Sequence, residues 1–255
     1  MRTALVTGST SGIGLAIAAH LAHLNYSVIL NGFGDAQLAI RSVQQATPGA
    51  KVGFVDADLM RASECTRMID EAEKMFGRLD VLVNNAGMQH VCPIESFPTE
   101  QWDRIMALNL NAVFHCTKAA LPFMKRQKFG RIINIASVHG LVGSANKCAY
   151  VAAKHGVIGF TKVAALELAS EDITVNSICP GWVLTPLVEK QIEAKSTEMG
   201  VSLEKAMELL VCEKMPSKTP ATVEELALAV SFFADSRNKS TRGVALNIDG
   251  GWVAQ

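Results

Sequence analysis

The sequence predicts an α/β protein whose doubly wound, mostly parallel sheet forms one domain over residues 1–255. Short apolar runs alternate with amphipathic helical patterns along nearly the whole chain, which is the order that parallel sheets produce. The first apolar run ends in a glycine-rich turn, and no segment of the 255 residues has the composition of a linker. The strands of such a sheet end at a common edge, so ligands are expected in a crevice there.

Composition argues against several classes of protein. Hydrophobic residues make up 49% of the chain and charged residues 19%, so a sizeable core can form. The 24 basic and 24 acidic side chains give a formal net charge of zero, which disfavours nucleic acid and anionic membranes as partners. No apolar run reaches the roughly 18 residues that span a bilayer, and no leader-like segment precedes the first strand, so a cytoplasmic protein is expected. The six cysteines are dispersed without a Cys-x-x-Cys pair, so neither disulfides nor a metal site is indicated.

A strand at residues 3–7, a glycine turn and a helix at residues 15–24 form the first unit. The turn, Gly8-Ser-Thr-Ser-Gly12-Ile-Gly14, places backbone amides and the positive end of the helix at one point, as pyrophosphate sites do. Its spacing, Gly-x3-Gly-x-Gly, differs from the commoner dinucleotide pattern Gly-x-Gly-x2-Gly. Taken alone, the turn is also compatible with a βα connection that binds no ligand.

The expected second strand, residues 27–31, ends at Asn31-Gly-Phe-Gly-Asp35. In dinucleotide sites, an acidic residue at this tip selects NAD through the ribose hydroxyls, whereas arginine accommodates the additional phosphate of NADP. The usual acid is missing here, although Asp35 lies nearby, and no Lys or Arg occurs between Arg2 and Arg41. Since no cation is available for the phosphate of NADP, NAD is the expected cofactor.

The next two strands, residues 52–55 and 79–83, lead into short polar segments. Asp56-Ala-Asp58-Leu59 follows the first of them, where Asp58 could face a ligand or cap the helix expected at residues 61–76. Asn84-Asn85-Ala86-Gly87 follows the second, and its small residues would let a ligand approach the sheet edge or would simply form a turn.

The second half of the chain continues the alternation. A long helical pattern covers residues 99–128 and contains Asn109; a buried strand at 131–136 then leads to Ser137. A helix at 149–169 and a strand at 174–178 precede Pro180-Gly181, and a helix at 221–234 and a strand at 244–248 complete the pattern. Residues 186–216, rich in Glu, Lys and Met, are expected to form a helical lid over the crevice, the alternative being a permanently packed surface pair.

Tyr150 and Lys154 are four residues apart, so on a helix they project from one face. A neighbouring ammonium favours the phenolate, so the pair suits acid–base chemistry, with the pKa of the tyrosine expected below its usual value of about 10. Taken without further motifs, such a pair is equally a solvated lysine beside a packed tyrosine.

Together these motifs resemble the short-chain dehydrogenase/reductase family over nearly the whole chain. The resemblance implies a Rossmann-type sheet, a nicotinamide cofactor, and catalysis by Ser137, Tyr150 and Lys154, with Asn109 holding a water that connects Lys154 to solvent. It also implies that the cofactor contacts Gly8, Thr10, Ser11, Gly12, Ile13, Gly14, Phe33, Asp58, Leu59, Asn85, Ala86, Gly87, Tyr150, Lys154, Pro180, Gly181 and Val183. Family members are typically homotetramers, with the helices carrying Asn109 and Tyr150 at the main interface.

Within the family, the chain most resembles the bacterial D-3-hydroxybutyrate dehydrogenases, through the runs at residues 31–34, 85–90, 137–142, 149–156 and 179–191. This resemblance implies NAD-dependent oxidation of D-3-hydroxybutyrate to acetoacetate, with Met88 and Cys148 at positions that vary. It implies that the 3-hydroxy acid contacts Gln89, Ser137, His139, Lys147, Tyr150, Trp182, Gln191 and Trp252.

The polar residues of the loops support an acidic substrate independently. A 3-hydroxy acid needs a partner for its carboxylate near the reacting hydroxyl, and Lys147 offers a cation with His139 and Gln89 as further donors. Each residue alone could equally be a solvated or backbone-bonded loop side chain. The alternatives are a reductase of acetoacetyl-CoA or acyl-carrier 3-ketoesters that uses NADPH, and a nucleotide-binding scaffold without catalysis.

Overall fold

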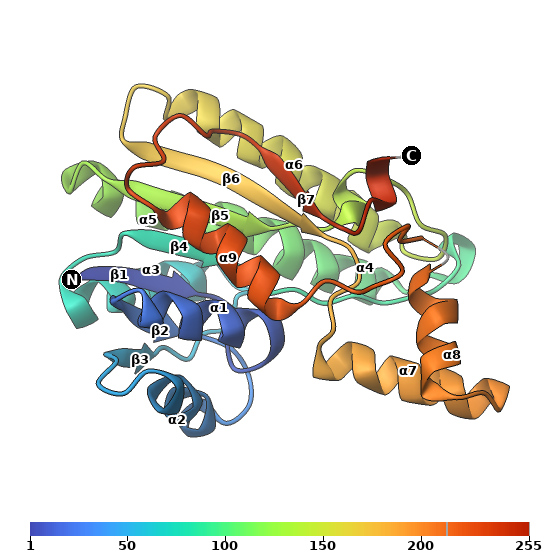
Figure 1. Cartoon of the computed structure of the whole chain (residues 1–255). Coiled ribbons are helices and arrows are strands. Elements are labelled where there is room, and N and C mark those ends of the chain that lie inside the picture. Colours follow the sequence, from blue (N-terminus) through green and yellow to red (C-terminus); the bar gives the residue numbers. More distant parts are fainter. Residues whose placement is uncertain (213, 255) are drawn as a thin grey trace.

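The computed structural model describes residues 1–212 and 214–254 and contains a seven-stranded sheet in the order β3-β2-β1-β4-β5-β6-β7. Every strand pair is parallel, which confirms the predicted fold class (Figure 1). The strands are β1 (Arg2–Val6), β2 (Tyr26–Leu30), β3 (Val52–Phe54), β4 (Val81–Asn84), β5 (Gly130–Ile135), β6 (Ile173–Pro180) and β7 (Ala245–Ile248).

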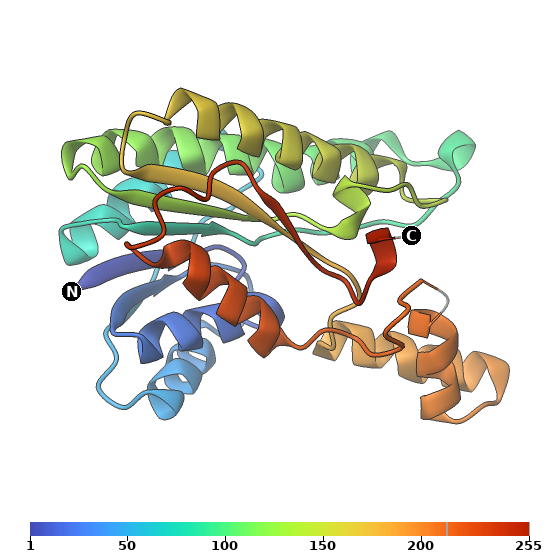
Figure 2. The same cartoon turned by 45° about the horizontal axis from the view of Figure 1, so that its top comes forward.

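Helices cover both faces of the sheet, as Figure 2 shows. The helices are α1 (Gly12–His23), α2 (Ala36–Ala46), α3 (Ala62–Phe76), α4 (Thr99–Met106), α5 (Ala112–Arg126), α6 (Cys148–Glu167), α7 (Pro186–Met199), α8 (Leu203–Met207) and α9 (Val223–Ala234). Core residues of α3, α5 and α6 pack on one face, and those of α1, α2 and α9 pack on the other. Because both faces are buried, the central strands are apolar in consecutive positions rather than alternating ones, as at Ile132 and Ile133.

The helix α2 is absent from the pattern expected from the sequence. Asp35 is its N-cap and accepts a hydrogen bond from the Leu38 amide at 2.9 Å. Only Ala39 and Val43 of this helix are buried, so it packs on the sheet through few side chains, although its sequence is amphipathic. The carboxylate near the strand tip therefore begins a helix.

The long helix expected at residues 99–128 is interrupted. Between α4 and α5 the backbone forms a π-helical segment, Ala107–Asn111, which contains the fully buried Asn109. Short π-helical segments within α-helices occur frequently at functional sites.

The segment expected to form a lid contains α7 and α8, followed by a π-helical segment, Glu208–Cys212. Both helices extend away from the sheet beyond the carboxyl ends of the strands (Figures 1 and 2). Ile192 of α7, Ala206 of α8 and Val211 of the π-helical segment are buried, and α7 contacts α8. Glu213, within the expected lid, and Gln255, at the end of the expected domain, lie outside the described residues.

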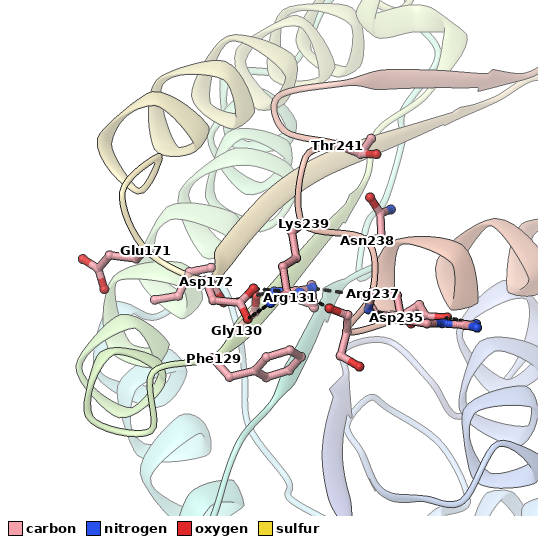
Figure 3. Close-up of polar contacts among 12 residues, drawn as sticks. Phe129, Gly130, Arg131, Glu171, Asp172, Asp235, Arg237, Asn238, Lys239 and Thr241 are labelled. Carbon is pink, nitrogen blue, oxygen red and sulfur yellow. Dashed lines mark hydrogen bonds and ion pairs between the residues drawn. The ribbon is translucent and has the colours of Figure 1, made fainter.

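Arg131 ties together loops at the amino-terminal edge of the sheet (Figure 3). Its fully buried guanidinium donates to the Gly130 carbonyl at 2.8 Å, the Asp172 carbonyl at 3.0 Å and the Ser236 carbonyl at 3.2 Å. It also donates to Asp172 Oδ1 at 2.9 Å, and its Cζ lies 4.3 Å from the Phe129 ring centroid. Burial lowers the pKa of Arg131, an effect that the bond to Asp172 opposes. We call these contacts of Arg131 the Arg131 cluster; it joins β5 to the loops before β6 and after α9.

None of the described helices is both long and apolar enough to cross a lipid bilayer.

Candidate active site

Two adjoining cavities lie at the carboxyl ends of the strands. The first, of about 290 Å³, contains Ser137, Tyr150 and Lys154 in its wall, and the second, of about 430 Å³, is lined by the glycine turn. Ile13, Asn85, Gly87 and Thr185 line both, so the two cavities form one crevice. This position agrees with the expectation for ligands of open α/β sheets.

The first cavity brings together the expected catalytic side chains. Ser137 follows β5 and its Oγ accepts a hydrogen bond from the His139 amide at 3.1 Å, which orients the hydroxyl. Lys154 is 4% exposed, and its Nζ donates to the Ile135 carbonyl at 2.7 Å and lies 5.6 Å from the Tyr150 ring centroid. The side chains of Ser137 and Tyr150 are hydrogen-bonded to each other.

The protonation of this pair differs from the expectation that Lys154 lowers the pKa of Tyr150. Burial raises the pKa of Tyr150, and the hydrogen bond to Ser137 opposes that rise only in part. Burial also lowers the pKa of Lys154 to about 8. The physical reason is that both groups lose hydration in the same pocket, while the ammonium donates to the Ile135 carbonyl.

Asn109 holds the segment that follows β4. Its Oδ1 accepts from the Met88 amide at 2.9 Å, and its Nδ2 donates to the Met88 carbonyl at 2.8 Å. Both ends of the amide are thus bonded to one residue at the wall of the cavity. The role of Asn109 in a proton relay through water stays a prediction.

The glycine turn has the geometry that a dinucleotide needs. Gly8 and Gly12 have φ angles of 60° and 54°, in the left-handed region that favours glycine. At Gly14, an added Cβ would lie 2.3 Å from the Gly8 carbonyl oxygen. Ser11 is the N-cap of α1 but makes no side-chain capping bond, so the first amides of the helix can bind an anion. The residues present therefore fit the pyrophosphate of a nicotinamide cofactor.

The polar loop residues expected to bind substrate lie around the first cavity. Gln89, His139, Lys147, Trp182, Gln191 and Trp252 all line it together with Tyr150. Lys147 Nζ lies 3.4 Å from His139 Nε2 and 5.9 Å from the Trp182 ring centroid. The His139 ring packs edge-on against Trp252, with ring centroids 5.4 Å apart.

Burial controls the charges of these groups. Burial and, to a smaller extent, the charge of Lys147 together lower the pKa of His139 to about 4. Burial also lowers the pKa of Lys147, which lies in the loop before α6. Near neutral pH the imidazole is therefore neutral, and its Nε2 accepts a hydrogen bond from the Lys147 ammonium.

The sequence profile described as short chain dehydrogenase matches residues 2–196, more than half of the chain. The protein belongs to this family. The chain is 54% identical over 254 residues to a protein of Cupriavidus necator named D-beta-hydroxybutyrate dehydrogenase, covering 100% of this chain and 98% of the relative. It is 49% identical over 257 residues to a protein of the same name from Rhizobium meliloti, covering 100% and 99%. Among solved structures, it resembles a variant of actinorhodin polyketide ketoreductase with NADPH, with a TM-score of 0.91, 34% identity, and coverage of 98% and 97%.

Most residues that the short-chain dehydrogenase pattern assigns to the cofactor line the crevice. Gly8, Thr10, Ser11, Gly12, Ile13, Gly14, Phe33, Leu59, Asn85, Ala86 and Gly87 line the second cavity. Tyr150, Lys154, Pro180, Gly181 and Val183 line the first. Thr10 Oγ1 also donates to the Phe33 carbonyl at 2.6 Å, which joins the glycine turn to the tip of β2.

Asp58 is an exception among these residues, because it lines neither cavity. Its Oδ1 accepts from the Met60 amide at 3.1 Å, and its Oδ2 lies 3.3 Å from Arg61 Nε. The carboxylate thus stabilises its own turn before α3, and it is not the side-chain cap of that helix either. The neighbouring Leu59 contacts the cavity instead.

Several cavity residues were missed by the sequence analysis. They are Asn31, Gly32, Ala57, Leu108 and Pro186 in the second cavity, and Met88, Ile135, Ala136, Val138 and Val188 in the first, with Thr185 in both. Asn31 could have been noticed in the sequence, because an amide at the end of a buried strand needs hydrogen-bond partners. Its Nδ2 donates to the Val55 and Ala57 carbonyls at 3.1 and 3.3 Å. The apolar residues could not have been recognised, because the local sequence pattern of a residue in a cavity wall is the same as that of a core residue.

Proposed function

We propose that the protein catalyses the NAD-dependent, reversible oxidation of D-3-hydroxybutyrate to acetoacetate. The observation that carries the proposal is the Lys147 ammonium, which lines the same cavity as Tyr150 and is bonded to a neutral His139. A carboxylate partner placed beside an acid–base phenol suits a hydroxy acid, whereas a neutral alcohol would need no such cation. The names of the two relatives at 54% and 49% identity support the same substrate.

The chemistry follows from the positions of the side chains. Ser137 donates a hydrogen bond to the reacting oxygen, and Tyr150 takes the hydroxyl proton during oxidation or returns it to the ketone during reduction. Lys154 stabilises the phenolate when it forms and supports the cofactor ribose. A nicotinamide cofactor held by the glycine turn would supply the hydride acceptor for the carbinol carbon in the oxidation direction. Because burial raises the pKa of Tyr150, the free enzyme holds the phenol protonated, ready to donate a proton in the reduction direction.

The preference for NAD over NADP is supported by the charge of the second cavity. Among the described residues that line it, none is Lys or Arg. The additional phosphate of NADP would therefore meet no cation, and the Asn31 side chain already bonds to two carbonyls.

The direct test is the initial rate of NADH formation from each enantiomer of 3-hydroxybutyrate, with NAD and with NADP. Turnover of the D form with NAD supports the proposal. No turnover of either enantiomer, together with reduction of acetoacetyl-CoA by NADPH, would favour the ketoester reductase instead. Binding of NADH without turnover of any 3-hydroxy or 3-keto acid would favour a nucleotide-binding scaffold.

Replacing Lys147 with alanine should raise KM for D-3-hydroxybutyrate about 10–100-fold, because a charge-assisted hydrogen bond contributes about 1.5–3 kcal/mol. Steady-state kinetics of the variant measure this, and KM for NAD should stay unchanged. Turnover of a neutral secondary alcohol should be equal in variant and wild type. The matched control is Lys51→Ala, which removes an exposed lysine before β3. An unchanged KM for the acid would remove Lys147 from the substrate site.

We propose that residues 186–216 act as a lid within the single domain. Val188 and Gln191 at the start of this segment line the first cavity, as does Thr185 just before it, so the position of the segment controls the access of water to the site.

We also propose a homotetramer in the cytoplasm, as the family resemblance implies. Exposed apolar side chains on α5 and α6 support the assembly: Phe114 is 44% exposed, Val163 54% and Leu166 77%. Light scattering of the purified protein measures the assembly, and a monomeric mass would overturn the proposal.

A further inference from the structure

A row of buried polar side chains crosses the central strands beneath the crevice. Asn84 on β4 faces Asn134 on β5 in the sheet register, and Asn134 faces Ser177 on β6. The three residues are 4%, 0% and 0% exposed and lie on the face covered by α5 and α6. Two residues earlier, the same strands carry apolar side chains in that core: Leu82, Ile132 and Val175. Polar groups in such a place cost free energy unless they are hydrogen-bonded.

The row is completed by Thr161 of α6, which is 1% exposed. Asn84 Nδ2 donates to Asn134 Oδ1 at 2.8 Å, and Asn134 Nδ2 donates to Thr161 Oγ1 at 2.9 Å. Thr161 Oγ1 donates to the Val157 carbonyl at 2.8 Å and lies 2.7 Å from Ser177 Oγ. A hydroxyl has one donor and two acceptor sites, so Ser177 is the donor in the last pair. Every hydrogen-bonding site of the Thr161 hydroxyl is therefore used.

Thr161 also shares a helix with the acid–base pair. It lies seven residues after Lys154, which is about two turns and about 10 Å along the axis, so both side chains point to the sheet. Lys154 Nζ bonds to the carbonyl of Ile135, the residue that follows Asn134 in β5. The helix α6 is thus joined to β5 at two places, once beneath the crevice and once within it.

Hydrogen bonds restrict this helix in a way that apolar packing does not. The hydrophobic effect is non-directional, so a helix held by it alone can shift along its axis at small cost. The Thr161 hydroxyl is bonded to both β5 and β6, so displacement of α6 along its axis lengthens or bends both bonds to the strands at once.

We propose that the hydrogen bonds of Thr161 to Asn134 and Ser177 set the axial position of α6 against β5, and so place Tyr150 and Lys154 relative to Ser137. Thr161 is in this sense a positioning residue that does not touch the substrate. The inference rests on the proposed function, because it concerns the acid–base group of that reaction.

The test is Thr161→Val, which keeps the branched shape and removes the hydroxyl. With D-3-hydroxybutyrate and NAD, kcat should fall about tenfold, since small displacements of catalytic groups are costly. KM for NAD should change by less than about twofold, because the glycine turn is untouched. Thr161→Ser restores the hydroxyl and should keep kcat within about twofold of wild type.

Two controls separate positioning from stability. Thr3→Val makes the same chemical change at a buried threonine whose Oγ1 has no hydrogen-bond partner among the described residues, and it should leave kcat unchanged. Asp172→Ala removes a carboxylate from the Arg131 cluster, at the opposite edge of the sheet, and should lower Tm while leaving kcat unchanged. If Thr161→Val behaves like Asp172→Ala, with a lower Tm and kcat within about twofold, the proposal is overturned.

A second measurement keeps the inference independent of the substrate. The chain has two tyrosines, so a Tyr26→Phe background leaves the phenol of Tyr150 alone to be titrated by the ultraviolet absorbance of tyrosinate. In that background, Thr161→Val should move the titration midpoint by about half a pH unit or more, because the surroundings of the phenol change. If wild type fails to oxidise 3-hydroxybutyrate and this midpoint still moves, the proposed function fails and the positioning role stands. An unmoved midpoint overturns the positioning role.

Discussion

Replacing Tyr150 with phenylalanine is expected to lower kcat for D-3-hydroxybutyrate oxidation by about 10²–10⁴-fold, the usual contribution of a positioned acid–base group. The substitution removes the Tyr150 hydroxyl and its hydrogen bond to Ser137 but keeps the ring, which packs edge-on against His139 with centroids 6.1 Å apart. The walls of the cavity therefore stay in place, and NADH should still bind, with an affinity that falls much less than kcat. Single-turnover kinetics with saturating NAD measure the chemical step directly.

The matched control is Tyr26→Phe, which removes the chain's other phenol. Its Oη donates to the Ala234 carbonyl at 3.1 Å, in the layer of α1 and α9. This variant should lose a little stability and no activity. A Tyr150→Phe enzyme that retained more than about a tenth of the wild-type kcat would show that another group transfers the proton.

Gly14→Ala is expected to have the second large effect, a loss of NADH affinity of about 100-fold. The new Cβ would lie 2.3 Å from the Gly8 carbonyl oxygen and 2.6 Å from Asn85 Nδ2. Neither atom can yield easily, because Asn85 Nδ2 bonds to the Gly8 carbonyl at 2.9 Å and to the Thr7 carbonyl at 2.8 Å. Overpacking costs about 1–3 kcal/mol, and the upper end of that range corresponds to about 100-fold in affinity.

Calorimetric titration with NADH measures this loss of affinity. The Tm of the variant shows how much the substitution also destabilises the fold. The matched control is Gly143→Ala, at an exposed position where an added Cβ meets nothing within 4 Å. It should bind NADH as wild type does. If Gly14→Ala also bound NADH normally, the cofactor would not depend on the close approach of the turn to β4.

The sequence predicted the elements that have strong periodic or apolar signals. All seven strands were expected close to their observed bounds, because a parallel sheet buried on both faces requires continuous apolar runs. The helix α2 was not among the expected elements, although its sequence is amphipathic. The interruption of the long helix at Asn109 was missed because π segments have no sequence pattern.

The sequence predicted which residues lie at the site better than it predicted their pKa values. Tyr150 and Lys154 lie together as their spacing indicates, yet spacing carries no information on desolvation, so the direction of the Tyr150 pKa shift was wrong. The family resemblance assigned Asp58 to the cofactor; the carboxylate is bonded to the Met60 amide of its own turn, and its contact with the cofactor stays a prediction. Both observations concern the surroundings of a side chain, which local sequence does not record.

The Arg131 cluster also bears on how such a protein can change its substrate. Six residue steps separate Arg131 from Ser137, or about 20 Å in an extended chain. Effects of substitutions at this separation usually add, with little coupling between them. Substitutions around Arg131 can therefore raise thermal stability independently of substitutions in the segments that carry His139 and Lys147. The added stability offsets the destabilisation that substitutions for new substrate specificity commonly cause. If stabilising substitutions at the amino-terminal edge of the sheet come first, the protein tolerates more of the substitutions that would let it accept other hydroxy acids.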